Sequence, residues 1–193
     1  MGMPRWPEDS RTRLVDAAIS LFGEHGYAAT TVDEIAARAG VTARTFFRHF
    51  GDKEEALFAE DDEMLPLMLA TIGDSTEPVT AEALMQRVLG RLAEHLEPRR
   101  PELTQRQAII DSEVSLTGRE LAKQARWQSA ITEALVARGF GAEHAGVLSA
   151  IGFALFSRTL HAWLAEPGGA TLSERLRDAL PRVRTVLDEV SSG

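Results

Sequence analysis

The chain has 193 residues, no cysteine and a formal net charge of −8 at pH 7. Without cysteine it has no disulfide, no cysteine ligand for a metal ion and no cysteine nucleophile, and its length is sufficient for one or two domains with a buried core. Residues 1–53 hold 7 Lys or Arg and 7 Asp or Glu, so the remaining residues, with 14 against 22, carry the whole excess of −8.

The first ten residues are expected to form a mobile arm. They contain no apolar run after Arg5, so they do not resemble a secretory signal, and we expect a cytoplasmic protein. Ser10 is a suitable N-cap for a helix that reaches about His25, and Gly26 ends that helix. Its apolar face consists of Leu14, Ala17, Ala18, Leu21 and Phe22.

Residues 31–53, TVDEIAARAGVTARTFFRHFGDK, predict two short helices joined by a tight turn and followed by the start of a third. Thr31 and Glu34 form a capping box, in which each side chain satisfies a free backbone N–H at the helix start. Gly40 stands where a left-handed C-terminal cap is needed, a conformation that glycine adopts without steric cost. The chain is therefore expected to turn at Gly40.

The second short helix is expected over residues 43–49, with Thr42 as its N-cap. Phe46 and Phe50 are four residues apart and share the face that points toward the core. The side chains left on the outer surface are Arg44, Thr45, Phe47, Arg48 and His49.

Two of these outer side chains are suited to reading base pairs. Arg44 can make a bidentate pair with guanine, and Thr45 can touch a thymine methyl group. Two short helices joined by a glycine turn are typical of a helix-turn-helix DNA reader, although an αα-hairpin without DNA binding shares this pattern. Asp52 and Glu55 form another capping box, and a phosphate beside Lys53 would be favoured by both the lysine and the helix dipole.

Residues 11–58 closely resemble the N-terminal domain of the tetracycline-repressor (TetR) family, through the motifs RTRLVDAAISLFGEHGY and TTVDEIAARAGVTARTFFRHFGDKEEALF. The resemblance implies an all-α homodimer of about nine helices per chain, with a three-helix helix-turn-helix domain at 1–52 and a helical ligand-binding and dimerisation domain at 53–193. Such proteins are most often transcriptional repressors that a small effector releases from double-stranded operator DNA.

The resemblance also implies which residues contact DNA. Position 47 is usually tyrosine in the family, so Phe47 lacks a hydroxyl that could bond a phosphate. The implied contact residues are Thr31, Arg44, Thr45, Phe47, Arg48, His49 and Lys53.

A fourth helix is expected from Lys53 toward Ile72. Pro66 interrupts it by removing one backbone hydrogen bond and clashing with the preceding turn, so the helix either kinks or ends there. The acidic residues 60–63 point in different directions around a helix, which favours a solvated face over a cation site.

Three helices are expected in the middle of the chain. Thr80 is a good N-cap for the first, and Pro101 suits the first position of the second. Thr117 and Glu120 form a capping box for the third. The expected ranges are 80–97, 101–112 and 117–139.

Residues 145–164, AGVLSAIGFALFSRTLHAWL, are apolar on nearly every face. This stretch is long enough for a membrane-spanning helix, but polar residues such as Arg158 interrupt it. We therefore expect a helix that is buried on several sides and no membrane contact. A last helix follows the capping box of Thr171 and Glu174 and should kink at Pro181. We expect these two helices to form either the interface of a homodimer or the last part of the monomer core.

The second half of the chain looks like the TetR subgroup that has an acyl-CoA-like ligand-binding domain, because Arg126-Trp127 and His161-Ala-Trp163-Leu164 occur in the same order. An apolar or acyl-CoA-like effector would suit an apolar pocket, although the same side chains could equally be ordinary core. The candidate pocket residues are Met64, Met68, Trp127, Phe153, Phe156 and Trp163.

No catalytic or metal-binding motif with specific spacing occurs in the sequence. The five histidines form no HExxH pair, and GxSxG is absent. We therefore expect a protein that is not an enzyme and that needs no metal or cofactor. The alternative is a helical small-molecule-binding protein or enzyme whose N-terminal hairpin is structural, and it predicts only weak, fully salt-sensitive DNA binding.

Overall fold

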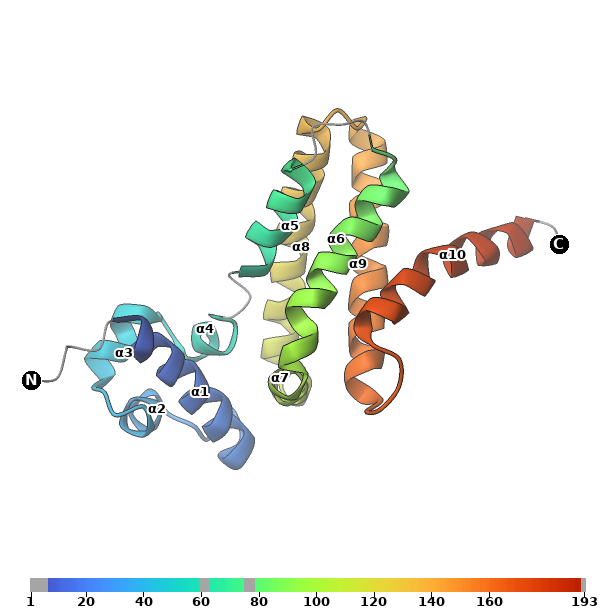
Figure 1. The fold of residues 1–193 in the computed structure, drawn as a ribbon. Helices are drawn as coiled ribbons and strands as arrows, with labels where there is room; N and C mark the ends of the chain where they lie inside the picture. Colours follow the sequence, from blue (N-terminus) through green and yellow to red (C-terminus); the bar gives the residue numbers. More distant parts are fainter. Residues whose placement is uncertain (1–6, 60–62, 75–78, 192–193) are drawn as a thin grey trace, which may run out of the picture. The chain divides into compact units, whose positions relative to one another are not determined.

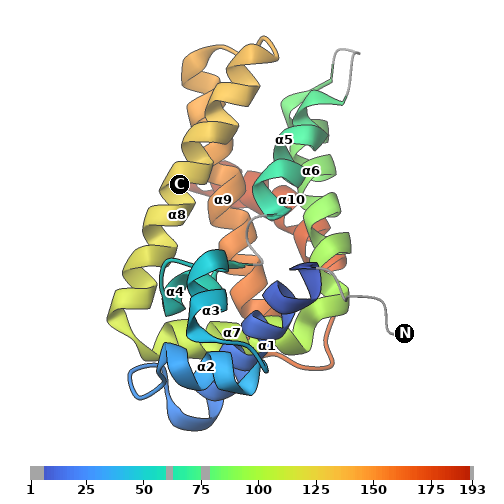
Figure 2. The ribbon, with the colours of Figure 1, turned by 90° about the vertical axis from the view of Figure 1, so that its left-hand side faces the viewer.

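The computed structural model describes the backbone of residues 7–59, 63–74 and 79–191. Over those ranges every regular element is a helix, labelled α1 to α10 with one short 3-10 helix, and there is no strand (Figures 1 and 2). The predicted all-α class with an N-terminal helix-turn-helix and a C-terminal helical part is therefore confirmed.

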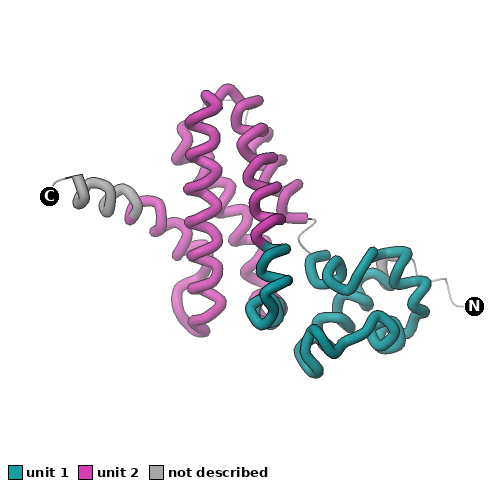
Figure 3. Tube along the Cα trace, turned by 180° about the vertical axis from the view of Figure 1, so that it is seen from behind, with its two compact units in different colours: residues 1–62, 105–120 teal, residues 63–104, 121–193 magenta. Residues whose placement is uncertain are grey.

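The chain divides into two compact units, coloured separately in Figure 3. Unit 1 comprises residues 1–62 and 105–120, and unit 2 comprises residues 63–104 and 121–193. The N-terminal helices thus share a unit with a short segment from the middle of the chain. The functional boundary between residues 52 and 53 stays a prediction.

Unit 1 is built on α1, which packs against α2, α3 and α4. Its core consists mainly of aliphatic and phenylalanine side chains, with Leu14, Ile35, Phe46 and Leu57 fully buried. The helices of this unit are α1 (Pro7–His25), α2 (Val32–Arg38), α3 (Ala43–His49), α4 (Lys53–Leu57), the end of α7 (Arg100–Ser112) and the start of α8 (Val114–Ala137).

Unit 2 is built on α6, which packs against α5, α9 and α10. The amphipathic α6 contributes Leu84, Leu89, Leu92 and Leu96 to a separate apolar core. The helices of this unit are α5 (Met64–Gly73), α6 (Ala81–Leu96), the 3-10 helix η2 (Glu97–Arg99), the first part of α7, the rest of α8, α9 (Ala142–Ala165) and α10 (Leu172–Ser191).

Two predicted helix starts are wrong. α1 already begins at Pro7, so Ser10 lies inside it instead of capping it. α8 begins at Val114, so Thr117 also lies inside a helix, and its hydroxyl donates to the carbonyl of Glu113 at 3.4 Å. Serine and threonine can bond a carbonyl in the preceding turn of a helix, so a hydroxyl residue that resembles a cap does not always mark a helix start.

The single fourth helix predicted from Lys53 toward Ile72 is two helices. α4 ends at Leu57 and α5 begins at Met64, while residues 60–62, with most of the acidic run, lie outside the described residues. Pro66 is the third residue of α5, a position in the first turn where the missing N–H removes no hydrogen bond within the helix. α10, in contrast, continues through Pro181.

Candidate DNA interface

The helix α2 begins with the predicted capping box. The Thr31 hydroxyl accepts a hydrogen bond from the Glu34 backbone N–H at 3.3 Å, and the Glu34 carboxylate accepts one from the Thr31 backbone N–H at 2.8 Å. The hydrogen bonds from the Thr31 backbone and hydroxyl lower the pKa of Glu34. The Thr31 side chain itself stays exposed at the helix start.

The turn between α2 and α3 depends on Gly40, whose φ is +68°. The Val41 backbone N–H donates to the carbonyl of Ala36 at 2.9 Å, which closes the end of α2. Arg13 of α1 donates to the carbonyl of Ala39 at 2.9 Å. The turn is therefore held both by its own backbone and by a side chain from another helix.

The helix α3 is held to the core by two aromatic rings, as predicted. Phe46 is completely buried and Phe50 nearly so, and their ring centroids lie 5.5 Å apart. Thr42 caps the helix by accepting a hydrogen bond from the Thr45 backbone N–H at 3.3 Å. These contacts determine which face of α3 points outward.

The outward face of α3 presents the groups expected of a base reader. Among the residues that the structure describes, none forms a hydrogen bond or ion pair with the exposed guanidinium of Arg44. Thr45 is half-buried, with its hydroxyl 3.2 Å from that of Thr42. Phe47 is 58% exposed, which is unusual for a phenylalanine, and Arg48 is also exposed.

His49 lies at the end of α3, half-buried against α1. Its Nε2 atom lies 2.9 Å from the hydroxyl of Ser10. Burial, together with the positive charges of Arg48 and Arg11, lowers the pKa of His49. The neutral imidazole is therefore favoured near pH 7, and it can offer a single N–H to a phosphate when Ser10 donates to Nε2.

Lys53 has an internal role that the sequence did not predict. Its ammonium group donates to the carbonyls of Tyr27 and Thr30 at 2.7 and 2.9 Å and lies 4.2 Å from the centroid of the Tyr27 ring. Two of its three N–H groups thus hold the loop between α1 and α2. A phosphate contact by Lys53 would use the third.

The start of α4 carries half of the predicted capping box. Asp52 accepts a hydrogen bond from the Glu55 backbone N–H at 2.7 Å, but the Glu55 carboxylate bonds the backbone N–H of Gly51 instead of that of Asp52. At the other end of the helix, Arg106 donates to the carbonyl of Leu57 at 3.1 Å. The short α4 is therefore held at both ends.

A polar network that the sequence did not reveal connects α4 to the loop before α2 and to α8. Tyr27 donates to the Glu54 carboxylate at 3.0 Å, and Arg119 donates to the same carboxylate at 2.8 Å and to Asp52 at 3.3 Å. Burial and the neighbouring Glu54 raise the pKa of the Tyr27 phenol. Arg119 lies far from α4 in the chain, so no local pattern could have indicated this contact.

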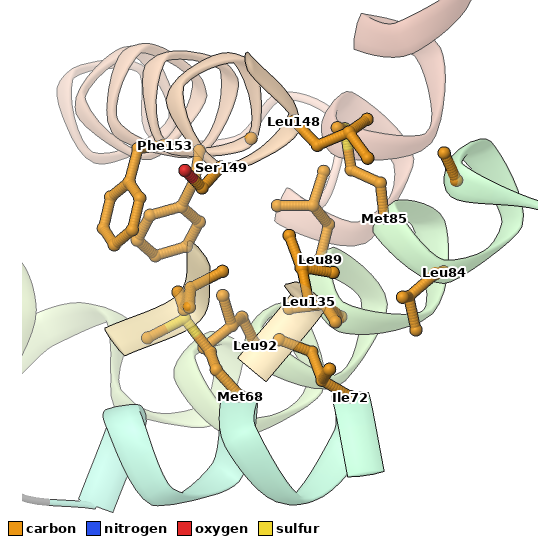
Figure 4. Close-up of a pocket in the computed structure, with 15 residues that line it drawn as sticks. Met68, Ile72, Leu84, Met85, Leu89, Leu92, Leu135, Leu148, Ser149 and Phe153 are labelled. Atoms are coloured by element: carbon orange, nitrogen blue, oxygen red, sulfur yellow. The ribbon is translucent and has the colours of Figure 1, made fainter. Parts of the chain in front are cut away.

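A second candidate site is an apolar cavity of about 60 Å³ inside unit 2 (Figure 4). Of the predicted pocket residues, Met68, Phe153 and Phe156 line it. Half of the twelve lining residues that were not predicted come from α6, whose amphipathic pattern was the available signal. The full lining is Met68, Ile72, Ala81, Leu84, Met85, Val88, Leu89, Leu92, Ile131, Leu135, Leu148, Ser149, Gly152, Phe153 and Phe156.

The other three predicted pocket residues lie elsewhere in unit 2. Met64 is buried in the same core without lining the cavity. Trp163 is buried beneath the guanidinium of Arg100, whose Cζ lies 4.6 Å from the ring centroid. Trp127 is partly buried, and the ammonium of Lys123 lies 4.9 Å from its ring centroid. These tryptophans contact cations and are not part of the cavity wall.

Comparison with known families identifies the N-terminal segment. Residues 14–60 match the family model described as "Bacterial regulatory proteins, tetR family". The HTH-type transcriptional regulator HbdR of Aromatoleum is 40% identical over 55 residues, which is 28% of this chain and 24% of HbdR. The HTH-type transcriptional repressor SCO4008 of Streptomyces coelicolor is 36% identical over 93 residues, 48% of this chain and 47% of the relative. The matched region thus spans about half or less of these curated relatives.

Solved structures resemble a larger part of the chain. A complex of SmeT with triclosan is 26% identical, with a TM-score of 0.62 over 90% of both chains, and SmeT is described as the repressor of a multidrug efflux pump of Stenotrophomonas maltophilia. The regulator FadR of Bacillus subtilis in complex with stearoyl-CoA is 20% identical, with a TM-score of 0.62 over 88% of this chain and 95% of FadR. The FadR likeness concerns the fold alone.

Proposed function

We propose that this chain, whose residues 14–60 belong to the tetR family of bacterial regulatory proteins, is a cytoplasmic transcriptional repressor that a small apolar or acyl-CoA-like effector releases from operator DNA. The observation that carries the proposal is the construction of α3. Its buried face is anchored by Phe46 and Phe50, while Arg44 on the opposite face has no partner among the described residues. An uncommitted guanidinium on a firmly held helix is suited to pairing with a guanine.

The proposed DNA contacts fall into two groups. Arg44 and Thr45 would face base edges and carry sequence specificity, while Thr31 and Lys53 would contact phosphates at the two ends of the interface. The other proposed contact residues, Phe47, Arg48 and His49, are the last three residues of α3. Phosphate contacts fix the position of a protein on the duplex, so the two groups should respond differently to a change of DNA sequence.

We propose that the protein acts as a homodimer, because a second copy would cover exposed apolar side chains of unit 2. Leu121 is 60% exposed and Val136 42% exposed on α8, and Val147 is 54% exposed on α9. α9 is also long and apolar enough to cross a membrane by length and composition alone, a test that the buried core helices of soluble proteins also pass, but only 17% of its apolar stretch is buried. The prediction that this helix is buried on several sides is therefore wrong for the single chain. The two α3 helices of such a dimer, the reader helices, could bind half-sites in successive major grooves.

The helix α8 offers a route from the cavity to the reader. Ile131 and Leu135 line the cavity, and Arg119 on the same helix bonds Glu54 of α4. An effector that binds better to one position of α8 would shift the population toward that position and could move α4. A change in the separation of the two reader helices would then weaken operator binding.

A mobility-shift titration with the DNA upstream of the protein's own coding sequence tests this function. We expect tight, sequence-specific binding that weakens when triclosan or an acyl-CoA, the ligands of the similar structures, or another apolar compound binds the protein. Binding that is weak and equal for all sequences, and that salt abolishes, would favour a helical ligand-binding protein with a structural hairpin. Unchanged operator affinity with every bound effector would contradict ligand-controlled release.

A further inference from the structure

We propose that the cavity of unit 2 binds an uncharged molecule with a single hydroxyl group on an apolar body, and that Ser149 contacts this hydroxyl. The inference rests on the proposed function only in treating the cavity as the effector site. It narrows the effector class from any apolar or acyl-CoA-like compound to small alcohols and phenols.

The wall of the cavity offers no partner to a charged group. None of the 15 lining residues is charged, and Ser149 is the one lining residue whose side chain carries an oxygen or nitrogen atom (Figure 4). A carboxylate or phosphate inside this wall would lose its water without gaining a cationic partner, which is strongly unfavourable. An apolar body with no formal charge avoids that loss.

The Ser149 side chain is 3% exposed, and its hydroxyl has two hydrogen-bond contacts but only one proton to donate. Its hydroxyl lies 3.0 Å from the carbonyl of Gly146 and 2.7 Å from the hydroxyl of Thr132, which in turn lies 2.9 Å from the carbonyl of Gln128. Carbonyls only accept, and each hydroxyl has one proton, so two protons serve three contacts.

This arrangement leaves Ser149 able to bond a ligand. In every arrangement of the two protons, the Ser149 oxygen keeps at least one lone pair that can accept a hydrogen bond. Ser149 can also turn its proton to a ligand, because the Gly146 carbonyl lies within α9, where it can accept a backbone N–H. A ligand hydroxyl both donates and accepts, so it can use either possibility.

The remaining wall suits a compact apolar body. The cavity of about 60 Å³ is small, and Met68 and Met85 are among its lining residues. Methionine side chains are unbranched and flexible, so they can move to admit an aliphatic or aromatic group larger than the empty space. A ligand of one ring or a short chain therefore fits this wall after small movements of the two methionines.

Four probes that share one apolar body test this inference by calorimetric titration of the full chain. They are ethylbenzene, 2-phenylethanol, phenylacetate and phenylacetyl-CoA. We expect 2-phenylethanol to bind at least tenfold more tightly than phenylacetate or phenylacetyl-CoA. Ser149→Ala should weaken 2-phenylethanol roughly two- to tenfold, the effect of one neutral hydrogen bond, and leave ethylbenzene unchanged.

Thr132→Val is the matched control, since Thr132 bonds Ser149 without lining the cavity, and it should leave 2-phenylethanol binding within about twofold of the original. Tighter binding of phenylacetyl-CoA, equal losses for ethylbenzene and 2-phenylethanol in Ser149→Ala, or no binding of any probe would overturn the inference. Operator binding by the ligand-free protein is measured separately, and its absence would contradict the proposed function instead.

Discussion

Units 1 and 2 are both helical, but they place their candidate functional side chains oppositely. Unit 1 exposes Arg44 and Phe47 on α3, while unit 2 encloses Ser149 beside a cavity. Helices as short as α2, α3 and α4 are not stable alone, and side chains from other parts of unit 1 hold the ends of α2 and α4. The difference teaches that a helix proposed to read DNA needs a fixed outer face, whereas a proposed effector site needs a space whose filling changes the energy of the surrounding helices.

The largest expected effect is a difference in stability between substitutions on the buried face and on the exposed face of α3. Phe46→Ala removes a completely buried ring and should destabilise unit 1 by about 3 to 5 kcal/mol. Phe47→Ala is the control, because Phe47 is 58% exposed and its loss should change stability by only about 0.5 kcal/mol. Thermal unfolding followed by circular dichroism measures both. Similar losses of stability would contradict the assignment of the two faces.

The next effect is a difference in operator binding between a substitution at a proposed base contact and one at a proposed phosphate contact. Arg44→Ala should weaken operator binding by about 1 to 3 kcal/mol and relax the preference at one base pair. Lys53→Ala should weaken binding to all sequences alike, and it should also lower stability because Lys53 holds the carbonyls of Tyr27 and Thr30. Mobility shifts with operator variants measure the difference. If both variants relax the same position, the assigned roles are incorrect.

A smaller effect tests whether the cavity is the effector site. Gly152→Ala places a methyl group at the cavity wall, 3.9 Å from the Met85 Cε atom, whereas the same change at Gly146 meets nothing within 4 Å. Both changes should stabilise α9 by about 0.5 to 1 kcal/mol, because alanine suits a helix better than glycine. Only Gly152→Ala should weaken effector binding in a thermal-shift titration. Equal weakening by both would argue against this site.

A further test concerns the connection between α8 and α4. Arg119→Ala removes a partly exposed ion pair with Glu54 and should cost about 0.5 to 1 kcal/mol of stability. We expect ligand-free operator affinity to change little but effector-induced release to need more effector. Arg126→Ala, an exposed position on the same helix, is the control. Normal release by the Arg119 variant would exclude this connection as the route.

The smallest effect is a pH dependence within unit 1. Arg38 and Ser20 bond Glu24 and lower its pKa to about 2 from an ordinary value of 4.5. Because the folded state holds this proton less tightly, the stabilisation is complete above about pH 4.5 and is lost as the pH falls toward 2. Arg38→Ala should therefore lower the melting temperature slightly at pH 7 and hardly at all at pH 2. A constant difference across this range would disagree with the expectation, and added salt should reduce the effect.

Much of the reader could be predicted because its signals are local. The capping box of Thr31 and Glu34, the positive φ of Gly40 and the shared face of Phe46 and Phe50 all depend on residues within one or two helical turns. The same holds for the capping box at Thr171, where the hydroxyl and the backbone N–H both bond Glu174. Local backbone geometry and spacing were sufficient for these features.

The cavity could be predicted only in part, because its wall combines several helices. Met68, Phe153 and Phe156 were expected, but Leu89 of α6 and Ser149 of α9 were not. An apolar stripe indicates that a helix face is buried, but it does not indicate whether the facing side chains fill the space between them. That outcome depends on how closely the helices approach.

By itself, the sequence determined the helical class, the bounds of α3 and the outward position of Arg44, since these follow from short-range spacing and capping. Only the tertiary structure decided that Lys53 holds the loop before α2, that Arg119 holds α4 and that Ser149 faces a cavity. These contacts join segments far apart in the chain, and no local pattern encodes the distance between two such side chains. The packing of helices sets that distance, and with it the chemistry that each side chain can perform.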